Sequence, residues 1–361
     1  MSEKLAIPGI DDISPAWLTQ ALRDGGMEGV TVKSVAAKRI GTGQGALCYR
    51  LTLDYEEDGD FPRSIVAKFP PEDEQQRQVA AQYNLYVREI NFYRYLLPNL
   101  TITSPKCYYA DIDGNGPEFI LLLEDVSPAR QGDQITGCSV AFARERVLDL
   151  VGLHAPSWRN ADMIDHAWLR NGDVDAYNAF LRDAYNKGYP LFLERCAAGL
   201  DPQELDILKR LSAAPVFPSE PPELAVYCLV HSDYRLDNFL IEESGDTPRI
   251  VVVDWQTLIA GNPMRDLAYF LGGCVLPQDL RPVEEAIVRD YHTAMVKAEV
   301  ADYAWKDCWD DYRRAVFLGI MTAVLGTYFV EKTERGDQLF AVMAKRHLQQ
   351  ALALGSAEFI R

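Results

Sequence analysis

The sequence has few basic residues for its length. It contains 36 Lys and Arg against 53 Asp and Glu, which gives a formal net charge of −17 over 361 residues. Proteins that bind nucleic acids neutralise phosphates with Lys and Arg, so we expect no nucleic-acid partner. The acidity is compatible with a cationic substrate, but it serves solubility equally well.

Paired cysteines and long apolar runs are also missing. The seven cysteines are scattered and form no CxxC pair, so the sequence offers no structural zinc site. Residues 1–4 lack the basic start and apolar core of a signal peptide. The longest uncharged run, residues 315–330, is shorter than the ~20 residues that span a bilayer, and we expect a buried helix there. These absences predict a cytoplasmic protein that does not interact with membranes.

The composition is that of a globular protein, with 48% hydrophobic and 25% charged residues. The first 125 residues are predicted to be rich in strands after a short helix over residues 15–23, for which Ser14 is a suitable N-cap. Runs of β-branched and alternating apolar residues, bounded by Gly, Pro and Asp, predict strands over 30–40, 48–53, 64–69, 106–111 and 119–123.

One main helix is expected among these strands. Its apolar residues recur at steps of three and four and form one stripe, and Pro98 ends it; they are Val79, Tyr83, Tyr86, Ile90, Tyr93 and Leu97. From residue 140 the pattern is mostly helical, apart from a hairpin-like stretch over 226–254. This order predicts an α+β fold whose boundary lies within 124–137.

The clearest chemical signal begins at His231. Asp233 directly precedes a short strand, Asn238 follows five residues later, and Asp254 ends a second hydrophobic strand. An amide oxygen and a carboxylate are suitable ligands for Mg²⁺, and Asp233 is placed to accept a proton from an attacking hydroxyl. This spacing is typical of phosphoryl-transfer enzymes of the kinase fold. A hairpin whose Asp and Asn only cap turns is the alternative.

The first hundred residues contain a matching set. Gly41, Gly43 and Gly45 lie between two expected strands, where backbone amides can approach phosphates. Lys68 ends a Val-Ala-Lys strand, and Glu89 borders the apolar stripe of the helix, from which it can reach Lys68. A glycine-rich turn and a solvated lysine would explain the first two features alone, but all five features occur in the order that a kinase requires.

These motifs resemble the aminoglycoside phosphotransferase/choline kinase superfamily, and within it the ecdysteroid-kinase-like (CHK-like) branch. The residues that carry the resemblance are 40–45 (IGTGQG), 66–68 (VAK), 86–93 (YVREINFY), 121–126 (LLLEDV), 153–155 (LHA), 231–238 (HSDYRLDN) and 253–256 (VDWQ). The resemblance implies a protein-kinase-like two-lobe fold. Residues 1–126 would form a nucleotide-binding N-lobe with a small antiparallel sheet and one main helix. Residues 127–361 would form a larger, mostly helical C-lobe with the acceptor site.

The resemblance also implies roles for the site residues. Asp233 would be the catalytic base, Asn238 and Asp254 would hold Mg²⁺, and Lys68, supported by Glu89, would bind the phosphates of ATP. Backbone groups near Glu124 and Val126 would hold the adenine, while the side chain of Asp125 would be structural. The family usually has Gly where this chain has Ser232, and Phe where it has Trp255.

Four further polar residues have less specific interpretations. Arg235 is expected to be a second catalytic residue, near the transferred phosphate; a salt bridge with Asp237 or Asp266 is the alternative. His231 is expected to order the catalytic loop by packing and hydrogen bonding, and Asp266 to anchor that loop. His154 is expected to be a structural histidine.

The acceptor is expected to be a small hydroxylated molecule. Only eleven residues separate Asp254 from Asp266, which is too few for the activation segment of a protein kinase. We therefore predict an ATP-dependent and Mg²⁺-dependent kinase of a small alcohol, steroid-like or phenolic acceptor. A kinase of a cationic aminoglycoside-like or choline-like substrate, and a nucleotide-binding pseudokinase, stay open as alternatives. The oligomeric state is left open.

Overall fold

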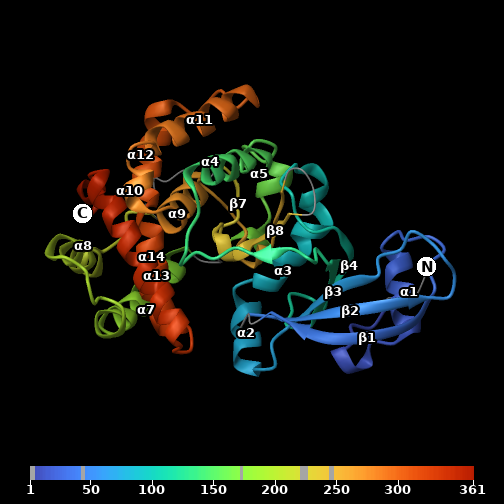
Figure 1. Cartoon of the computed structure of the whole chain (residues 1–361). Helices are drawn as coiled ribbons and strands as arrows, with labels where there is room; N and C mark the ends of the chain where they lie inside the picture. The colour runs from blue at the N-terminus through green and yellow to red at the C-terminus, as the bar shows by residue number, and fades with distance from the viewer. Residues whose placement is uncertain (1–4, 42–44, 171–173, 220–226, 244–247) are drawn as a thin grey trace. The chain divides into compact units, whose positions relative to one another are not determined.

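The computed structural model describes residues 5–41, 45–170, 174–219, 227–243 and 248–361 (Figure 1). Its contacts group the chain into two compact units. Unit 1 comprises Met1–Asn99, Thr103–Arg130 and Leu240–Leu258, and unit 2 comprises Leu100–Ile102, Gln131–Phe239 and Ile259–Arg361. The stretch that holds Asp254 thus groups with the N-terminal part of the chain. The expected functional lobes, 1–126 and 127–361, stay a prediction.

Unit 1 is built on a five-stranded antiparallel sheet with the strand order β1-β2-β3-β5-β4. The strands are β1 (Val32–Ile40), β2 (Leu47–Tyr55), β3 (Ser64–Phe69), β4 (Cys107–Ile112) and β5 (Phe119–Glu124). They confirm the five strands predicted from the sequence. The short strand β6 (Arg130–Gln131) falls where the chain passes from unit 1 to unit 2.

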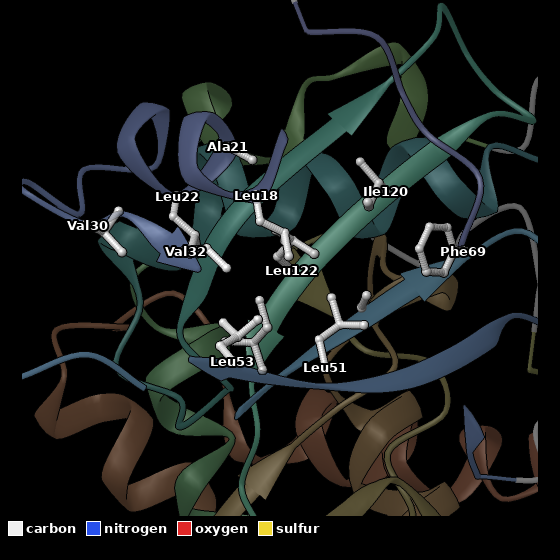
Figure 2. Packing of buried hydrophobic residues seen from close by; sticks show 12 residues of the cluster. Leu18, Ala21, Leu22, Val30, Val32, Leu51, Leu53, Phe69, Ile120 and Leu122 are labelled. Carbon is white, nitrogen blue, oxygen red and sulfur yellow. The ribbon is translucent and has the colours of Figure 1, made fainter. Parts of the chain in front are cut away.

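The first helix, α1 (Pro15–Asp24), covers the apolar face of this sheet. It begins as predicted, because the Oγ of Ser14 accepts a hydrogen bond from the Trp17 amide at 3.1 Å. Figure 2 shows Leu18 and Leu22 of α1 directed toward the strands, where apolar side chains of β1, β2, β3 and β5 complete the core. This packing stabilises the sheet that carries Lys68.

The main helix of unit 1 is interrupted, and the prediction of one continuous helix was wrong. Asn84 has a left-handed backbone (φ 60°), which separates α2 (Glu74–Gln82) from α3 (Leu85–Asn91). Beyond α3 the chain forms a π-helical turn (Phe92–Leu96) and a short 3-10 turn (Leu97–Asn99). Because of the interruption, Val79 is 46% exposed and does not belong to the buried apolar stripe. The stripe lies on α3, and Glu89 is buried beside it.

The third segment of unit 1 carries β8 (Phe239–Glu242) except for its first residue, β9 (Arg249–Val252) and a 3-10 turn (Trp255–Thr257). Trp255 is fully buried and stacks on Phe92, with ring centroids 3.7 Å apart. Its indole N–H donates to the Oγ of Ser104 at 2.9 Å, and the Val252 amide donates to the Thr103 carbonyl at 2.9 Å. These contacts explain why the segment with Asp254 belongs to unit 1.

Unit 2 is mostly helical, as predicted. Its strands β7 (Cys228–Val230) and β10 (Ile259–Gly261) pair antiparallel. Its helices are α4 (Val140–Asp149), α5 (Val151–His154), α6 (Ala161–Ile164), α7 (Val174–Arg195), α8 (Pro202–Ala213), α9 (Met264–Cys274), α10 (Pro277–Leu280), α11 (Glu284–Lys297), α12 (Trp305–Ala315), α13 (Phe317–Phe329) and α14 (Glu334–Ala353).

The uncharged run over 315–330 forms α13, most of which is buried between α7 and α14, as expected (Figure 1). Helix α9 is buried along almost its whole length. No helix within the described ranges is both long and apolar enough to cross a membrane. The buried α9 carries residues that hold the loop of Asp233.

Candidate active site

Lys68 and Glu89 form a buried ion pair in unit 1. Lys68 lies on β3 and Glu89 on α3, and the lysine Nζ is 2.8 Å from Oε1 and 2.7 Å from Oε2 of the glutamate. Both residues are more than 90% buried. The pairing predicted from the position of Glu89 beside the apolar stripe is therefore confirmed. Two opposite charges hold each other in place where neither is solvated.

Asp254 adds a second carboxylate to this pair, with its Oδ1 3.2 Å from the Nζ of Lys68. Burial disfavours the lysine charge, but Asp254 and Glu89 together raise the pKa of Lys68 above its ordinary value. Burial raises the pKa of Glu89, an effect that the ammonium of Lys68 opposes. Lys68 is thus an ammonium held between two carboxylates.

The backbone of Asp254 is itself unusual, with φ 67° and ψ 70° in the left-handed region. A non-glycine residue adopts this conformation only where its surroundings enforce it, and such residues gather at functional sites. The Asp254 side chain is 44% exposed, although Lys68 beside it is buried. The Oδ1 of Asp254 therefore faces the ammonium of Lys68, while the Asp254 carboxylate remains accessible to a ligand.

The glycine-rich segment joins β1 to β2. Gly41 has φ 73°, a left-handed conformation that glycine adopts without strain, and Gly43 lies outside the described residues. A Cβ at Gly45 would lie 3.3 Å from the Oε1 of Gln256, so a side chain there would crowd the residue after Trp255. The structure places Gly41 and Gly45 at the two ends of this connection.

The expected hinge, residues 124–126, is ordered by its neighbours. The Asp125 carboxylate accepts from the Arg50 Nε at 2.6 Å and from the Ser64 Oγ at 2.7 Å. Burial opposes its charge, but these bonds lower the pKa of Asp125 below its ordinary value, so its side chain is structural, as predicted. The Glu124 side chain pairs with Arg249, at 2.6 Å, and the Val126 carbonyl accepts from the Ala129 amide at 2.9 Å.

In unit 2, the loop after β7 is anchored to α9 by Asp266. The fully buried Asp266 accepts the amide of His231 with Oδ2 and the amide of Ser232 with Oδ1, both at 2.8 Å. His231 is also buried, and its Nδ1 is 3.3 Å from the amide of Asp233. His154 is a structural histidine, with Nδ1 2.8 Å from the Tyr291 hydroxyl. The expectations for Asp266, His231 and His154 are confirmed.

The carboxylate of Asp233 accepts hydrogen bonds from three side chains of unit 2. The Nδ2 of Asn238 donates to its Oδ2 at 2.8 Å, and the Nε of Arg235 donates to the same oxygen at 3.1 Å. The hydroxyl of Tyr269 donates to Oδ1 at 3.0 Å. The carboxylate is 26% exposed, so it is both held in orientation and open on one side.

Arg235 forms salt bridges with two carboxylates. Besides Asp233, its Nη1 donates to the Oδ2 of Asp237 at 3.1 Å and to the Oε1 of Gln134 at 3.3 Å. Burial disfavours its charge, but Asp233, the Tyr269 oxygen and Asp237 raise the pKa of Arg235. The predicted salt bridge with Asp237 is therefore present. The other candidate partner, Asp266, instead accepts the amides of the loop.

Asn238 and Asp254 each offer a hard oxygen for Mg²⁺ within their own unit. Because the Nδ2 of Asn238 donates to Asp233, its amide oxygen is the end available for accepting or ligating. The Asp254 carboxylate is accessible, as described above. This donor chemistry fits Mg²⁺, which prefers carboxylate and amide oxygens.

A family model that matches most of the chain identifies its family. The ecdysteroid kinase-like family matches residues 41–301, which include the glycine-rich segment, Lys68, Glu89, Asp233 and Asp254. The chain belongs to the ecdysteroid kinase-like family. The motifs in the sequence predicted this family, and the α+β fold, with an antiparallel sheet followed by a mostly helical part, agrees with the prediction. A search of curated proteins found no match.

Solved structures of similar fold are more distant. A spectinomycin phosphotransferase in complex with ADP and spectinomycin is 16% identical (TM-score 0.48, covering 96% of this chain and 99% of that one). A microcompartment-associated aminopropanol kinase is 14% identical (TM-score 0.47, 95% and 99%). An ethanolamine kinase of Plasmodium vivax is 11% identical (TM-score 0.47, 93% and 86%). The family assignment rests on the family model alone.

Two departures from the usual family pattern have structural explanations. Ser232 has φ 66°, the left-handed region that glycine adopts freely, and the bond from its amide to Asp266 holds the serine there. Trp255 fills the space beside Phe92 and satisfies its indole N–H with Ser104. Both replacements are therefore accommodated by this chain's own contacts.

Sequence reasoning missed Tyr269. The only available signal was its spacing, because a residue three positions after Asp266 on a helix lies on the same face and can reach the same loop. The contact itself joins residues 36 positions apart, which no local pattern reveals.

Proposed function

We propose that this member of the ecdysteroid kinase-like family is an ATP-dependent small-molecule kinase. It transfers the γ-phosphate to a hydroxyl of a small alcohol, steroid-like or phenolic acceptor. The observation that supports this most strongly is the buried ammonium of Lys68 between Glu89 and Asp254. A protonated lysine, fixed by one carboxylate and next to an accessible second one, is suited to bind phosphates together with a divalent cation.

In the proposed reaction, Asp233 orients the acceptor hydroxyl and accepts its proton as the oxygen attacks the γ-phosphorus. The bond between the γ-phosphorus and the β-γ bridging oxygen breaks, and ADP leaves. Lys68 binds the α- and β-phosphates, and Glu89 holds its ammonium in position. Asn238 and Asp254 would hold Mg²⁺, which when bound neutralises charge on the phosphates. Arg235 acts as a positioning residue for Asp233, because its guanidinium is already paired with Asp233 and Asp237.

Backbone groups bind the nucleotide as well, in addition to Lys68. The amides of Gly41, Gly43 and Gly45 approach the phosphates, and the backbone near Glu124 and Val126 binds the adenine. The side chain of Glu124 contributes to the hinge itself, through Arg249. The acceptor hydroxyl then meets the open side of the Asp233 carboxylate.

The test is ADP release from ATP and Mg²⁺ in the presence of three acceptor pools: aminosugars with choline, steroid and terpenoid alcohols, and phenols. We expect release with the second or third pool, and at least a 100-fold loss in Asp233→Asn, as for removal of a general base. Asp310→Asn is the matched control, because it makes the same change in a surface ion pair with Lys306. Its turnover should equal that of the unmodified chain.

Binding of Mg²⁺ and ATP is measured separately. Asp233→Asn should bind them with unchanged affinity, whereas Asp254→Ala should weaken binding that depends on Mg²⁺. Binding without turnover in any pool would favour a pseudokinase. Turnover with the first pool would favour a cationic substrate. Full activity in Asp233→Asn would overturn the assignment of the base.

A further inference from the structure

Helix α9 meets the loop of Asp233 through two side chains on one face. Asp266 and Tyr269 are three residues apart and therefore lie next to each other on the helix. Asp266 holds the backbone of the loop at His231 and Ser232, and Tyr269 reaches the side chain of Asp233. One buried helix thus fixes both the path of the loop and the orientation of its carboxylate.

Tyr269 and Asn238 donate hydrogen bonds to different oxygens of the Asp233 carboxylate. The Asn238 amide donates to Oδ2 of Asp233, and the Tyr269 hydroxyl donates to Oδ1 at 3.0 Å. A carboxylate rotates easily about its Cβ–Cγ bond unless both oxygens are fixed. Arg235 lies 3.1 Å from Oδ2 and 3.0 Å from Oδ1, so it does not distinguish the two oxygens. Tyr269 is the donor that sets the rotation.

Tyr269 is itself rigid and chemically inert. It is 1% exposed, and its ring stacks on His347 of α14, with centroids 6.0 Å apart and planes 23° apart. Burial, followed by the charge of Asp233, raises the pKa of Tyr269 well above its ordinary value. The hydroxyl therefore keeps its proton and serves as a donor, and it cannot replace Asp233 as the base.

We propose that Tyr269 is a positioning residue for phosphoryl transfer: its hydroxyl fixes the carboxylate of Asp233 in the orientation that accepts the proton of the acceptor. The inference rests on the proposed kinase function. A base that is misoriented retains its chemistry but meets the hydroxyl less often in productive geometry. Loss of the hydroxyl should therefore lower kcat and leave nucleotide affinity unchanged.

The experiment compares Tyr269→Phe with Tyr312→Phe in the full chain. Tyr312 is also fully buried and also donates to a carboxylate, Glu284 Oε1 at 2.7 Å, so the control removes the same group from a similar environment. We expect Tyr269→Phe to reduce kcat about 10-fold, as for loss of one hydrogen bond to a charged group, with unchanged KM for ATP. Tyr312→Phe should keep the kcat of the unmodified chain.

Asp233→Asn and the double variant Asp233→Asn/Tyr269→Phe complete a double-mutant cycle with Tyr269→Phe and the unmodified chain. Turnover of the double variant should equal that of Asp233→Asn, because Tyr269 acts only through that carboxylate. If the unmodified chain turns over no acceptor, the proposed function fails. If Asp233→Asn is fully active, the assignment of Asp233 as the base fails, and the present inference fails with it. If Asp233→Asn is inactive and Tyr269→Phe retains full kcat, only the present inference fails.

A second measurement does not need the acceptor. The unfolding free energies of the four proteins in the cycle should be non-additive, since the hydroxyl and the carboxylate contact each other. Additive stabilities would show that the hydrogen bond is absent and would overturn the inference.

Discussion

The amide of Ser232 donates to the Oδ1 of Asp266 at 2.8 Å, although the serine backbone is left-handed. The other oxygen of Asp266 accepts the preceding amide, at His231. A non-glycine residue in this conformation costs about 1–2 kcal/mol, and a charge-assisted hydrogen bond offsets a cost of that size. The loop of Asp233 therefore depends on one buried carboxylate of α9.

Asp266→Ala should destabilise the protein by about 2–4 kcal/mol. The substitution removes the acceptor of the buried His231 amide and of the part-buried Ser232 amide, and a buried group without a partner costs about 1–3 kcal/mol. Urea denaturation at neutral pH measures the loss. Asp266→Asn keeps one acceptor oxygen and should be less destabilised. A free energy of unfolding within 0.5 kcal/mol of the unmodified value in Asp266→Ala would contradict this prediction.

Glu89→Ala should destabilise the protein by about 3 kcal/mol, because it removes a partner from a buried ion pair. Among the residues that the structure describes, Lys68 then retains the more distant carboxylate of Asp254, at 3.2 Å, as its ion-pair partner. The double variant Glu89→Leu/Lys68→Met removes both buried charges and should regain part of this loss. Denaturant unfolding of the single variants Glu89→Leu and Lys68→Met and of the double variant measures the coupling. Strictly additive effects would show that the two side chains do not interact.

Nucleotide binding should be lost whenever Lys68 is replaced.

His347 should make stability depend on pH between about 6.5 and 4. Burial lowers the pKa of His347 from 6.5 to about 4, so below pH 6.5 the unfolded chain binds a proton that the folded chain does not. This contribution to stability is complete above pH 6.5 and is lost as the pH falls toward 4, by about 3 kcal/mol.

The measurement for His347 is a comparison with His347→Gln at several pH values. Glutamine is neutral throughout and can still hydrogen bond to Gln350, which is the partner of the imidazole Nδ1 at 3.1 Å. The difference in unfolding free energy between the two proteins should shift in favour of the variant as the pH falls. A difference that is constant from pH 7 to pH 4 would show that His347 titrates normally.

Trp255→Phe, which restores the residue usual in the family, should destabilise this chain by about 1–3 kcal/mol. The smaller ring leaves a cavity beside Phe92 and removes the N–H that Ser104 accepts. Thermal and urea unfolding measure the loss. Ser104→Ala removes only the acceptor and should cost less. Catalytic activity should persist in Trp255→Phe, because Asp254 keeps its contact with Lys68.

Much of unit 1 could be predicted from local pattern. Alternating apolar residues marked the five strands, and the position of Glu89 beside an apolar stripe was enough to predict its pairing with Lys68. The interruption at Asn84 was not predictable in this way. The apolar spacing continues across the interruption, while the break lies in the left-handed backbone of a single residue, Asn84.

The sequence by itself determined which chemical groups are present and in what order. The proposed base, the two proposed metal ligands and the proposed phosphate lysine follow from residue type and spacing, because strand and helix periods act over a few residues. Only the tertiary structure decided which groups meet. It placed Asp254 beside Lys68 across 186 positions and Tyr269 beside Asp233 across 36. Such contacts arise from the packing of whole elements, α9 against a loop and a late segment against an early sheet, and no local pattern encodes that packing.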